Sequence, residues 1–160
     1  ILSGMNALLT DLYELNMVAS YLRRGMDGTA TFSLFVRRLP ATRGFIVAAG
    51  IESSLDFLEQ VHFEEEDLSY LAEGLGFKPA DVEAFRRFRF TGDLWAIPEG
   101  RIALAGEPLL EVTAPLPEAQ LVETFLLNRV TFESTIASKA ARCVIATSMT
   151  LPSGTADPCT

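Results

Sequence analysis

Few residues in this sequence of 160 are of types that perform chemistry on their own. His62 is the only histidine, and the two cysteines, Cys143 and Cys159, lie far from it in the sequence. Zinc sites need several His, Cys or carboxylate ligands, and nucleophilic triads need a histidine beside a nucleophile. The glycine-rich motifs that bind nucleotide phosphates are also missing. We therefore expect no self-contained metal or hydrolase site, and we interpret His62 as a loop residue and Cys143 as a small core residue.

The charged residues are more informative. The net charge is −8, and residues 52–83 contain ten acidic residues against one basic residue, Lys78. We interpret this segment as the exposed faces of two helices, and its sign argues against nucleic-acid binding. Eleven of the thirteen basic residues are arginine. The planar guanidinium group suits phosphate and carboxylate groups, because it can form two parallel hydrogen bonds with them.

Length and composition indicate one globular domain. Apolar residues make up 49% and charged residues 21% of the sequence, which excludes a disordered chain. No apolar run reaches the roughly 18–20 residues of a membrane span, and no signal peptide is visible. Two cysteines do not make the disulfide framework of a small secreted domain. We therefore expect a cytoplasmic protein that does not bind membranes.

The elements that must position functional residues begin with a helix and a strand. Apolar residues repeat at helical spacing after Thr10, whose hydroxyl is suited to cap the first turn. Residues 29–38 alternate in polarity and are rich in β-forming types. This pattern predicts a strand with Phe32 and Leu34 on one face and Phe35 on the other.

Further helices and strands follow. An apolar helix is predicted over 45–60, with Leu55, Phe57 and Leu58 facing inward, and two acidic helices over 64–73 and 79–88. Strands are predicted over 92–97 and 101–113, punctuated by Pro98-Glu99-Gly100 and Gly106-Glu107-Pro108. Residues 118–147 carry a helical pattern that is long for a globular protein, so we expect a break near Phe132. Together these elements predict an α+β fold.

Several segments resemble, in order and spacing, the N-terminal part of nicotinate phosphoribosyltransferase from about residue 7 to residue 146. The first contains Thr10-Asp11-Leu12-Tyr13, and the second contains a Phe-x-x-Phe strand followed by Arg38. Each segment alone is a weak signal, but their agreement in order is a strong one. The matching segments are Leu8–Met17, Phe32–Pro40, Gly44–Gly50, Phe90–Asp93, Ile97–Gly100, Glu107–Leu110, Gln120–Thr124 and Ile136–Arg142.

The resemblance implies an enzyme of NAD biosynthesis that joins nicotinate to phosphoribosyl pyrophosphate, giving nicotinate mononucleotide and pyrophosphate. The family couples this transfer to ATP hydrolysis through a phosphohistidine and uses Mg²⁺. The implied architecture is that of a type II phosphoribosyltransferase: an α/β domain, a barrel, and a homodimer with composite sites. Since the ribosyl group passes through an oxocarbenium-like state, positioning and charge stabilisation supply most of the rate.

Three residues match substrate-contacting positions of the family: Asp11, Tyr13 and Arg38. The resemblance implies that Tyr13 stacks on the pyridine ring in the neighbouring subunit's site, and that Arg38 contacts the phosphates of the ribosyl donor. Each has a structural alternative. Tyr13 suits a core or interface aromatic residue, Asp11 a helix N-terminal acid favoured by the dipole, and Arg38 a solvated residue at a strand end.

The resemblance assigns residues 1–146 to the N-terminal domain. Residues 147–160 are rich in Ser, Thr and Pro, and we interpret them as disordered or foreign to the fold. In this family a barrel and the phosphorylated histidine follow, and His62 does not match that histidine. We therefore expect the chain alone to be inactive, as a fragment. We also expect apolar residues such as Leu109, Leu110 and Phe125 to face solvent in it.

Two other interpretations stay open. The first is a related phosphoribosyltransferase that uses nicotinamide or quinolinate, since most residues that select the base lie outside the matching segments. The second is a non-catalytic dimerisation or binding module. The matching segments favour nicotinate, and an activity assay separates an enzyme from a binding module.

Overall fold

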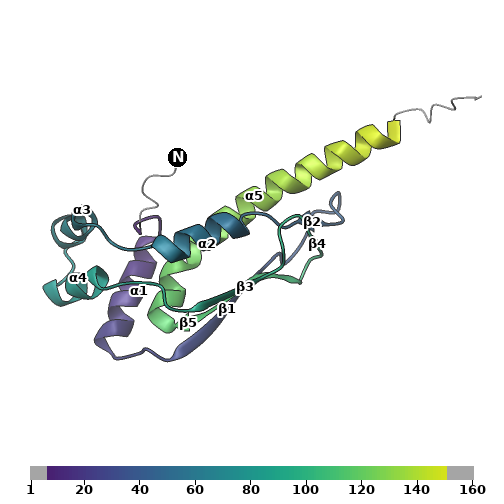
Figure 1. Ribbon diagram of the computed structural model, residues 1–160. Helices are drawn as coiled ribbons and strands as arrows, with labels where there is room; N and C mark the ends of the chain where they lie inside the picture. Colours follow the sequence, from purple (N-terminus) through teal and green to yellow (C-terminus); the bar gives the residue numbers. More distant parts are fainter. Residues whose placement is uncertain (1–6, 151–160) are drawn as a thin grey trace, which may run out of the picture.

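The main sheet has three antiparallel strands in the order β1-β5-β3 (Figure 1). β1 (Thr29–Phe35) and β3 (Asp93–Ala96) lie on either side of β5 (Pro108–Pro115). In β1, Phe32 and Leu34 are half-buried and Phe35 is exposed, as predicted. The alternation follows from the pleat of the strand, which turns successive side chains to opposite faces.

A second sheet pairs two short strands, β2 (Ile46–Val47) and β4 (Ile102–Ala103). The prediction of a helix over 45–60 is therefore wrong for its first residues, and α2 spans Ile51–Gln60. Short apolar runs do not distinguish a strand from a helix by periodicity. The strand segment predicted over 101–113 is interrupted near the predicted Gly106-Glu107-Pro108 break, because non-strand residues 104–107 separate β4 from β5.

Residues 7–150 are the part of the chain that this computed structural model describes, with only the backbone of residues 149 and 150. Helix α1 spans Leu12–Arg23, and its N-cap is Asp11 rather than Thr10, which corrects the predicted start. The predicted acidic helices are present as α3 (Glu65–Ser69), continued by a π-helical turn, and α4 (Pro79–Arg86). The α+β class is thus confirmed.

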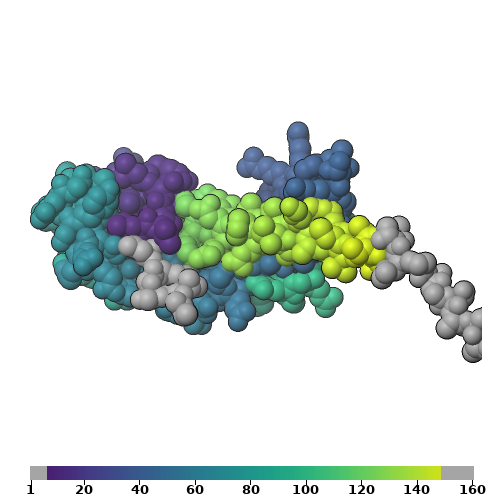
Figure 2. Space-filling view, turned by 90° about the horizontal axis from the view of Figure 1, so that it is seen from above, coloured from purple at the N-terminus to yellow at the C-terminus, as the bar shows by residue number. Residues whose placement is uncertain are grey.

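Helix α5 spans Leu116–Thr150 without interruption, so the break expected near Phe132 is wrong. After Pro117 in its first turn, the helix contains neither proline nor glycine. No residue in it therefore removes a backbone hydrogen bond of the helix, as an internal proline would. Residues 147–150 of the predicted tail continue this helix, and residues 151–160 lie outside the described part of the chain. The C-terminal half extends beyond the body of the molecule (Figures 1 and 2). No helix within residues 7–150 has the length and apolar character to cross a membrane.

The core lies around α5, which packs against α1 and α2 and against strands β1 and β5 of the three-stranded sheet (Figure 1). The Phe57 ring of α2 stacks on the Phe125 ring of α5, with centroids 3.7 Å apart. Leu109, Leu110 and Phe125 are buried, so the expectation that they face solvent is wrong. Cys143, expected in the core, is exposed on the protruding part of α5.

Two serines of α5 attach β2 to the helix. The Ser138 hydroxyl accepts a hydrogen bond from the Val47 amide at 2.8 Å and donates one to the Ser134 carbonyl. The Ser134 hydroxyl contacts both the amide and the carbonyl of Ala49 at 3.0 Å. Buried backbone groups need such partners. Ser138 therefore packs within the fold.

Candidate functional site

Asp11 and Tyr13 lie together where the N-terminal turn of α1 meets α5. The Asp11 carboxylate makes no capping hydrogen bond, and it accepts one from the Thr124 hydroxyl of α5 at 3.4 Å. The Tyr13 side chain is 50% exposed, whereas the next residues of α1, Glu14 and Leu15, are buried. One face of the Tyr13 ring is thus accessible from outside the domain.

Glu14 belongs to the same cluster, and the sequence analysis did not identify it. It is completely buried. The Tyr13 hydroxyl donates a hydrogen bond to Glu14 Oε1 at 3.3 Å, and the Thr10 hydroxyl contacts Glu14 Oε2. The Thr124 hydroxyl is a further partner of this carboxyl group. A carboxyl group surrounded by hydroxyls thus lies next to the hydroxyl of the exposed tyrosine.

The environment shifts the acidity of both side chains. Burial raises the pKa of Glu14 above its ordinary value, an effect that hydrogen bonds from Thr10 and Thr124 partly oppose. Partial burial and the nearby Glu14 and Glu123 carboxylates also raise the pKa of Tyr13. Tyr13 is therefore an uncharged phenol at physiological pH, and Glu14 resists ionisation.

Replacing Glu14 with glutamine is expected to flatten the pH dependence of folding stability. Because the pKa of Glu14 is raised in the folded chain, the folded state binds more protons than the unfolded state above pH 4.5. The wild-type free energy of unfolding should therefore fall as pH rises from about 4.5 to the folded-state pKa. Urea denaturation of both chains at several pH values gives the difference curve, and parallel curves for the two chains would contradict the prediction.

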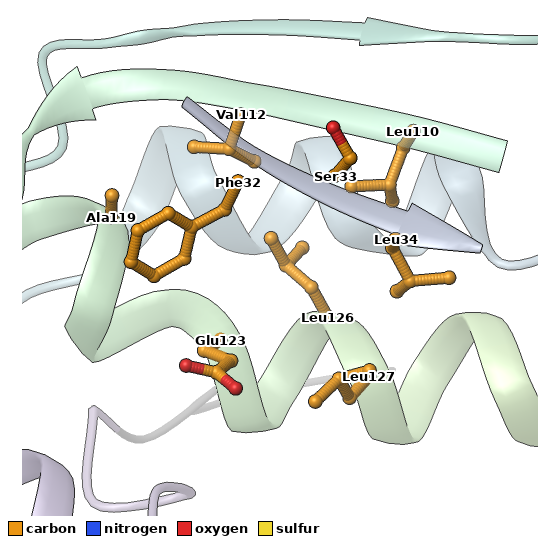
Figure 3. A pocket seen from close by; sticks show the side chains of 9 residues that line it. All are labelled: Phe32, Ser33, Leu34, Leu110, Val112, Ala119, Glu123, Leu126 and Leu127. Atoms are coloured by element: carbon orange, nitrogen blue, oxygen red, sulfur yellow. The ribbon is translucent and has the colours of Figure 1, made fainter. Parts of the chain in front are cut away.

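A cavity of about 280 Å³ opens between the sheet and α5 beside this cluster (Figure 3). Phe32 and Leu34 of β1 face Leu126 of α5 across it. Glu123 is the one acidic group of its lining, and the Gln120 side chain donates a hydrogen bond to it at 2.9 Å. The cavity is mostly apolar, so it offers surface for packing. Its lining contains no positively charged group that could bind a phosphate.

Arg38 lies elsewhere. It is exposed and follows β1, in a segment that stands out beside α5, away from the N-terminal segment in purple (Figure 2). In the described part of the chain, no hydrogen bond or ion pair joins Arg38 to Asp11 or Tyr13. The structure thus brings together two of the three predicted site residues and leaves the third apart.

The signals for the residues that were missed are partly in the sequence. Thr10 and Glu14 are four residues apart, which places them on one face of a helical turn. Glu123 and Thr124 lie in a segment that carries the family resemblance, but nothing in the sequence pairs that segment with Glu14. Their proximity is a property of the packing of α1 on α5.

Metal-ion and nucleotide binding find no support in these residues. Within residues 7–150, no three His, Cys, Asp or Glu side chains form a group that could hold a metal ion. His62 lies in the loop after α2, where its ring contacts the Gln60 carbonyl and the Glu64 carboxylate. The described residues therefore do not form an Mg²⁺ site on their own.

Known proteins resemble this chain over most of its length. It is 48% identical over 143 residues to nicotinate phosphoribosyltransferase pncB2 of Mycobacterium tuberculosis, covering 89% of this chain and 31% of that protein. It is 45% identical over 137 residues to nicotinate phosphoribosyltransferase of Bacillus subtilis, covering 85% of this chain and 28% of that protein. The chain thus spans about a third of the length of these relatives.

Comparison of the fold with solved structures leads to the same family as the comparison of sequences. The crystal structure of human nicotinic acid phosphoribosyltransferase matches with a TM-score of 0.75 and 38% identity, over 83% of this chain and 27% of that one. The model of the nicotinate phosphoribosyltransferase (NAPRTase) N-terminal domain matches residues 8–131, a span that holds Asp11, Tyr13, Glu14 and Arg38. With sequence and fold in agreement over this span, the chain belongs to the nicotinate phosphoribosyltransferase N-terminal domain family.

Proposed function

We propose that this chain is the N-terminal part of a nicotinate phosphoribosyltransferase and that Tyr13 provides the surface on which the base stacks. The reaction joins the pyridine nitrogen of nicotinate to C1 of phosphoribosyl pyrophosphate and releases pyrophosphate. The observation that carries the proposal is the match of residues 8–131 to the family. Relatives that are 48% and 45% identical bear this enzyme's name.

The exposure of Tyr13 supports its part in the proposal. A half-exposed tyrosine above a buried carboxyl group offers a flat face to a planar ring, while its hydroxyl is already bonded to Glu14. The alternative of a core aromatic residue fits less well, because a core side chain is shielded on both faces. Asp11 holds the same turn against α5 through Thr124.

The separation of Arg38 from Tyr13 supports a composite site. A single chain cannot bring both residues to one substrate when the segments that carry them lie on different parts of its surface (Figure 2). A homodimer overcomes this if Tyr13 of one subunit completes the site to which Arg38 of the other contributes. In that arrangement Arg38 holds donor phosphate by paired hydrogen bonds, and Tyr13 holds the base flat against the reacting carbon.

The local charge also bears on how nicotinate would lie. The carboxylates of Asp11 and Glu123 lie near Tyr13, and they repel other carboxylates. The nicotinate carboxylate would therefore point away from α1, toward cations supplied by the rest of the enzyme. Mg²⁺, ATP coupling and a cytoplasmic location belong to the same proposal and follow from the family resemblance.

An assay of product formation tests the proposal. The complete enzyme that contains this domain should convert nicotinate more efficiently than nicotinamide or quinolinate, by a factor of about 100 or more, with phosphoribosyl pyrophosphate, Mg²⁺ and ATP. The 160-residue chain should give no product under the same conditions, because it spans only about a third of the length of its relatives. Preference for either other base would contradict the proposal, and turnover by the chain alone would contradict the expectation that this part of the enzyme is inactive by itself.

A further inference from the structure

The burial of Glu14 needs a physical explanation. Within residues 7–150 no arginine or lysine forms an ion pair with it, although it is completely buried. The titratable groups that face it are Asp11 and Tyr13 on α1 and Glu123 on α5, and none of them carries a positive charge. A buried carboxylate without a cation is costly, so this environment favours the protonated, neutral form.

The hydrogen-bond partners lead to the same conclusion. The Thr10 hydroxyl contacts both Glu14 Oε2 and the Leu121 carbonyl of α5, the latter at 3.3 Å, but it has one proton to donate. The Thr124 hydroxyl likewise faces both Asp11 and Glu14. If Glu14 is ionised, these hydroxyls face more acceptors than they can satisfy. A proton on Glu14 Oε2 removes the deficit, because Glu14 then donates to Thr10, which donates to Leu121.

We propose that Glu14 is a positioning residue that acts in its protonated form and holds the Tyr13 hydroxyl through a chain of hydrogen bonds that ends at the Leu121 carbonyl of α5. This inference rests on the proposed function, since it concerns the ring on which nicotinate would stack. With the proton on Glu14 Oε2, the contact between Glu14 and the Thr10 hydroxyl runs from Glu14 to Thr10. Tyr13 then donates to Glu14 Oε1, and Thr10 donates to the Leu121 carbonyl. The exposed ring is thereby fixed to both helices.

The proposal makes nicotinate binding depend on pH. When Glu14 loses its proton, the chain of hydrogen bonds is interrupted, and a negative charge appears next to the Tyr13 hydroxyl. Both effects weaken the binding of an anionic base, so the nicotinate KM should rise with pH. Glutamine at position 14 can accept from Tyr13 and donate to Thr10 at every pH, and it should therefore remove this pH dependence.

The first test uses the 160-residue chain and needs no catalysis. The chain has three tyrosines, Tyr13, Tyr21 and Tyr70, and the Y13F variant identifies the Tyr13 signal in a spectrum of ¹³Cζ-labelled tyrosine. In the wild type this signal should shift with a midpoint above pH 4.5, and in E14Q it should not shift between pH 4.5 and pH 8. D81N is the matched control, because Asp81 is a buried acid bonded to Arg23 at the other end of α1.

The second test measures the nicotinate KM and kcat of the complete enzyme. E14L should raise KM about fivefold at pH 6 with kcat nearly unchanged, which corresponds to the loss of one hydrogen bond. Y13F should have a similar effect, and the E14L/Y13F double variant should be no worse than either single variant, because both remove the same bond. E14Q should restore KM to near the wild-type value.

The outcomes separate this inference from the proposed function. A Tyr13 signal that titrates alike in wild type, E14Q and D81N overturns the positioning role, as does an additive E14L/Y13F pair. If Y13A leaves KM unchanged while the Tyr13 signal still depends on Glu14, the hydrogen-bond chain stands and the proposed stacking of the base fails. If Y13A raises KM while E14L changes neither KM nor the signal, the stacking stands and Glu14 is only a structural residue.

Discussion

Substitution of Gly50 by alanine is expected to destabilise the fold by about 2–5 kcal/mol, through two independent effects. Gly50 precedes α2 with a φ of +89°, a conformation that costs other residues about 1–2 kcal/mol. A Cβ atom there would also lie 2.9 Å from the Arg129 carbonyl oxygen and 3.0 Å from Val130 Cα of α5. Crowding a packed interior typically costs about 1–3 kcal/mol, and here the neighbouring atoms are backbone.

Gly106 provides the matched control for this experiment. Its φ is +88°, and no atom lies within 4 Å of the position that a Cβ would take. Gly106→Ala should therefore show the conformational cost alone. Thermal unfolding should give a melting temperature roughly 4–20 °C below wild type for Gly50→Ala, with a smaller loss for Gly106→Ala. Equal losses in the two variants would mean that α2 does not approach α5 as closely as described.

Tyr13→Ala in the complete enzyme should raise the nicotinate KM and lower kcat/KM about tenfold or more. Loss of an aromatic stacking partner is worth about 0.5–1.5 kcal/mol beyond the buried area, and a displaced base adds to this loss. Tyr13→Phe keeps the ring and removes only the hydrogen bond to Glu14, so its kcat/KM should stay within about fivefold of wild type. Steady-state kinetics of the two variants separate the face of the ring from its hydroxyl.

The same variants also test the structural alternative. Because half of the Tyr13 side chain is exposed, its truncation should lower the melting temperature by only a few degrees. A Tyr13→Ala enzyme with a normal KM and a greatly lowered melting temperature would show that the residue is a packing residue. A raised KM with a nearly unchanged melting temperature would support the role in binding.

Local patterns predicted the elements that carry the site, and they failed where distant residues decide the structure. The strand 29–38 and the acidic helices follow from alternation and from charge, which neighbouring residues determine. The segment 45–50 reads as helical, but hydroxyls of Ser134 and Ser138, some ninety positions away, bond its backbone in an extended form.

The residues of the candidate site were likewise predictable only in part. Asp11 and Tyr13 could be identified because they lie in one segment that resembles the family. Glu14 is adjacent to them, yet as a glutamate in an amphipathic helix it reads as an exposed residue. Only the packing of α5 over the first turn of α1 makes it buried, and no single-sequence pattern specifies which turn of one helix covers another.

The attachment of β2 to α5 has a consequence for self-association. A strand with an unpaired edge can add a strand from another molecule and so start aggregation. On one edge, the Ala48 amide and carbonyl bond to Arg101 and Gly100, next to β4. On the opposite edge, the groups that would accept an incoming strand, at Val47 and Ala49, are occupied by the Ser138 and Ser134 hydroxyls. Helix α5 therefore occupies the edge of β2 to which another strand could otherwise bind. A strand from another molecule could add there only after these hydrogen bonds had been broken.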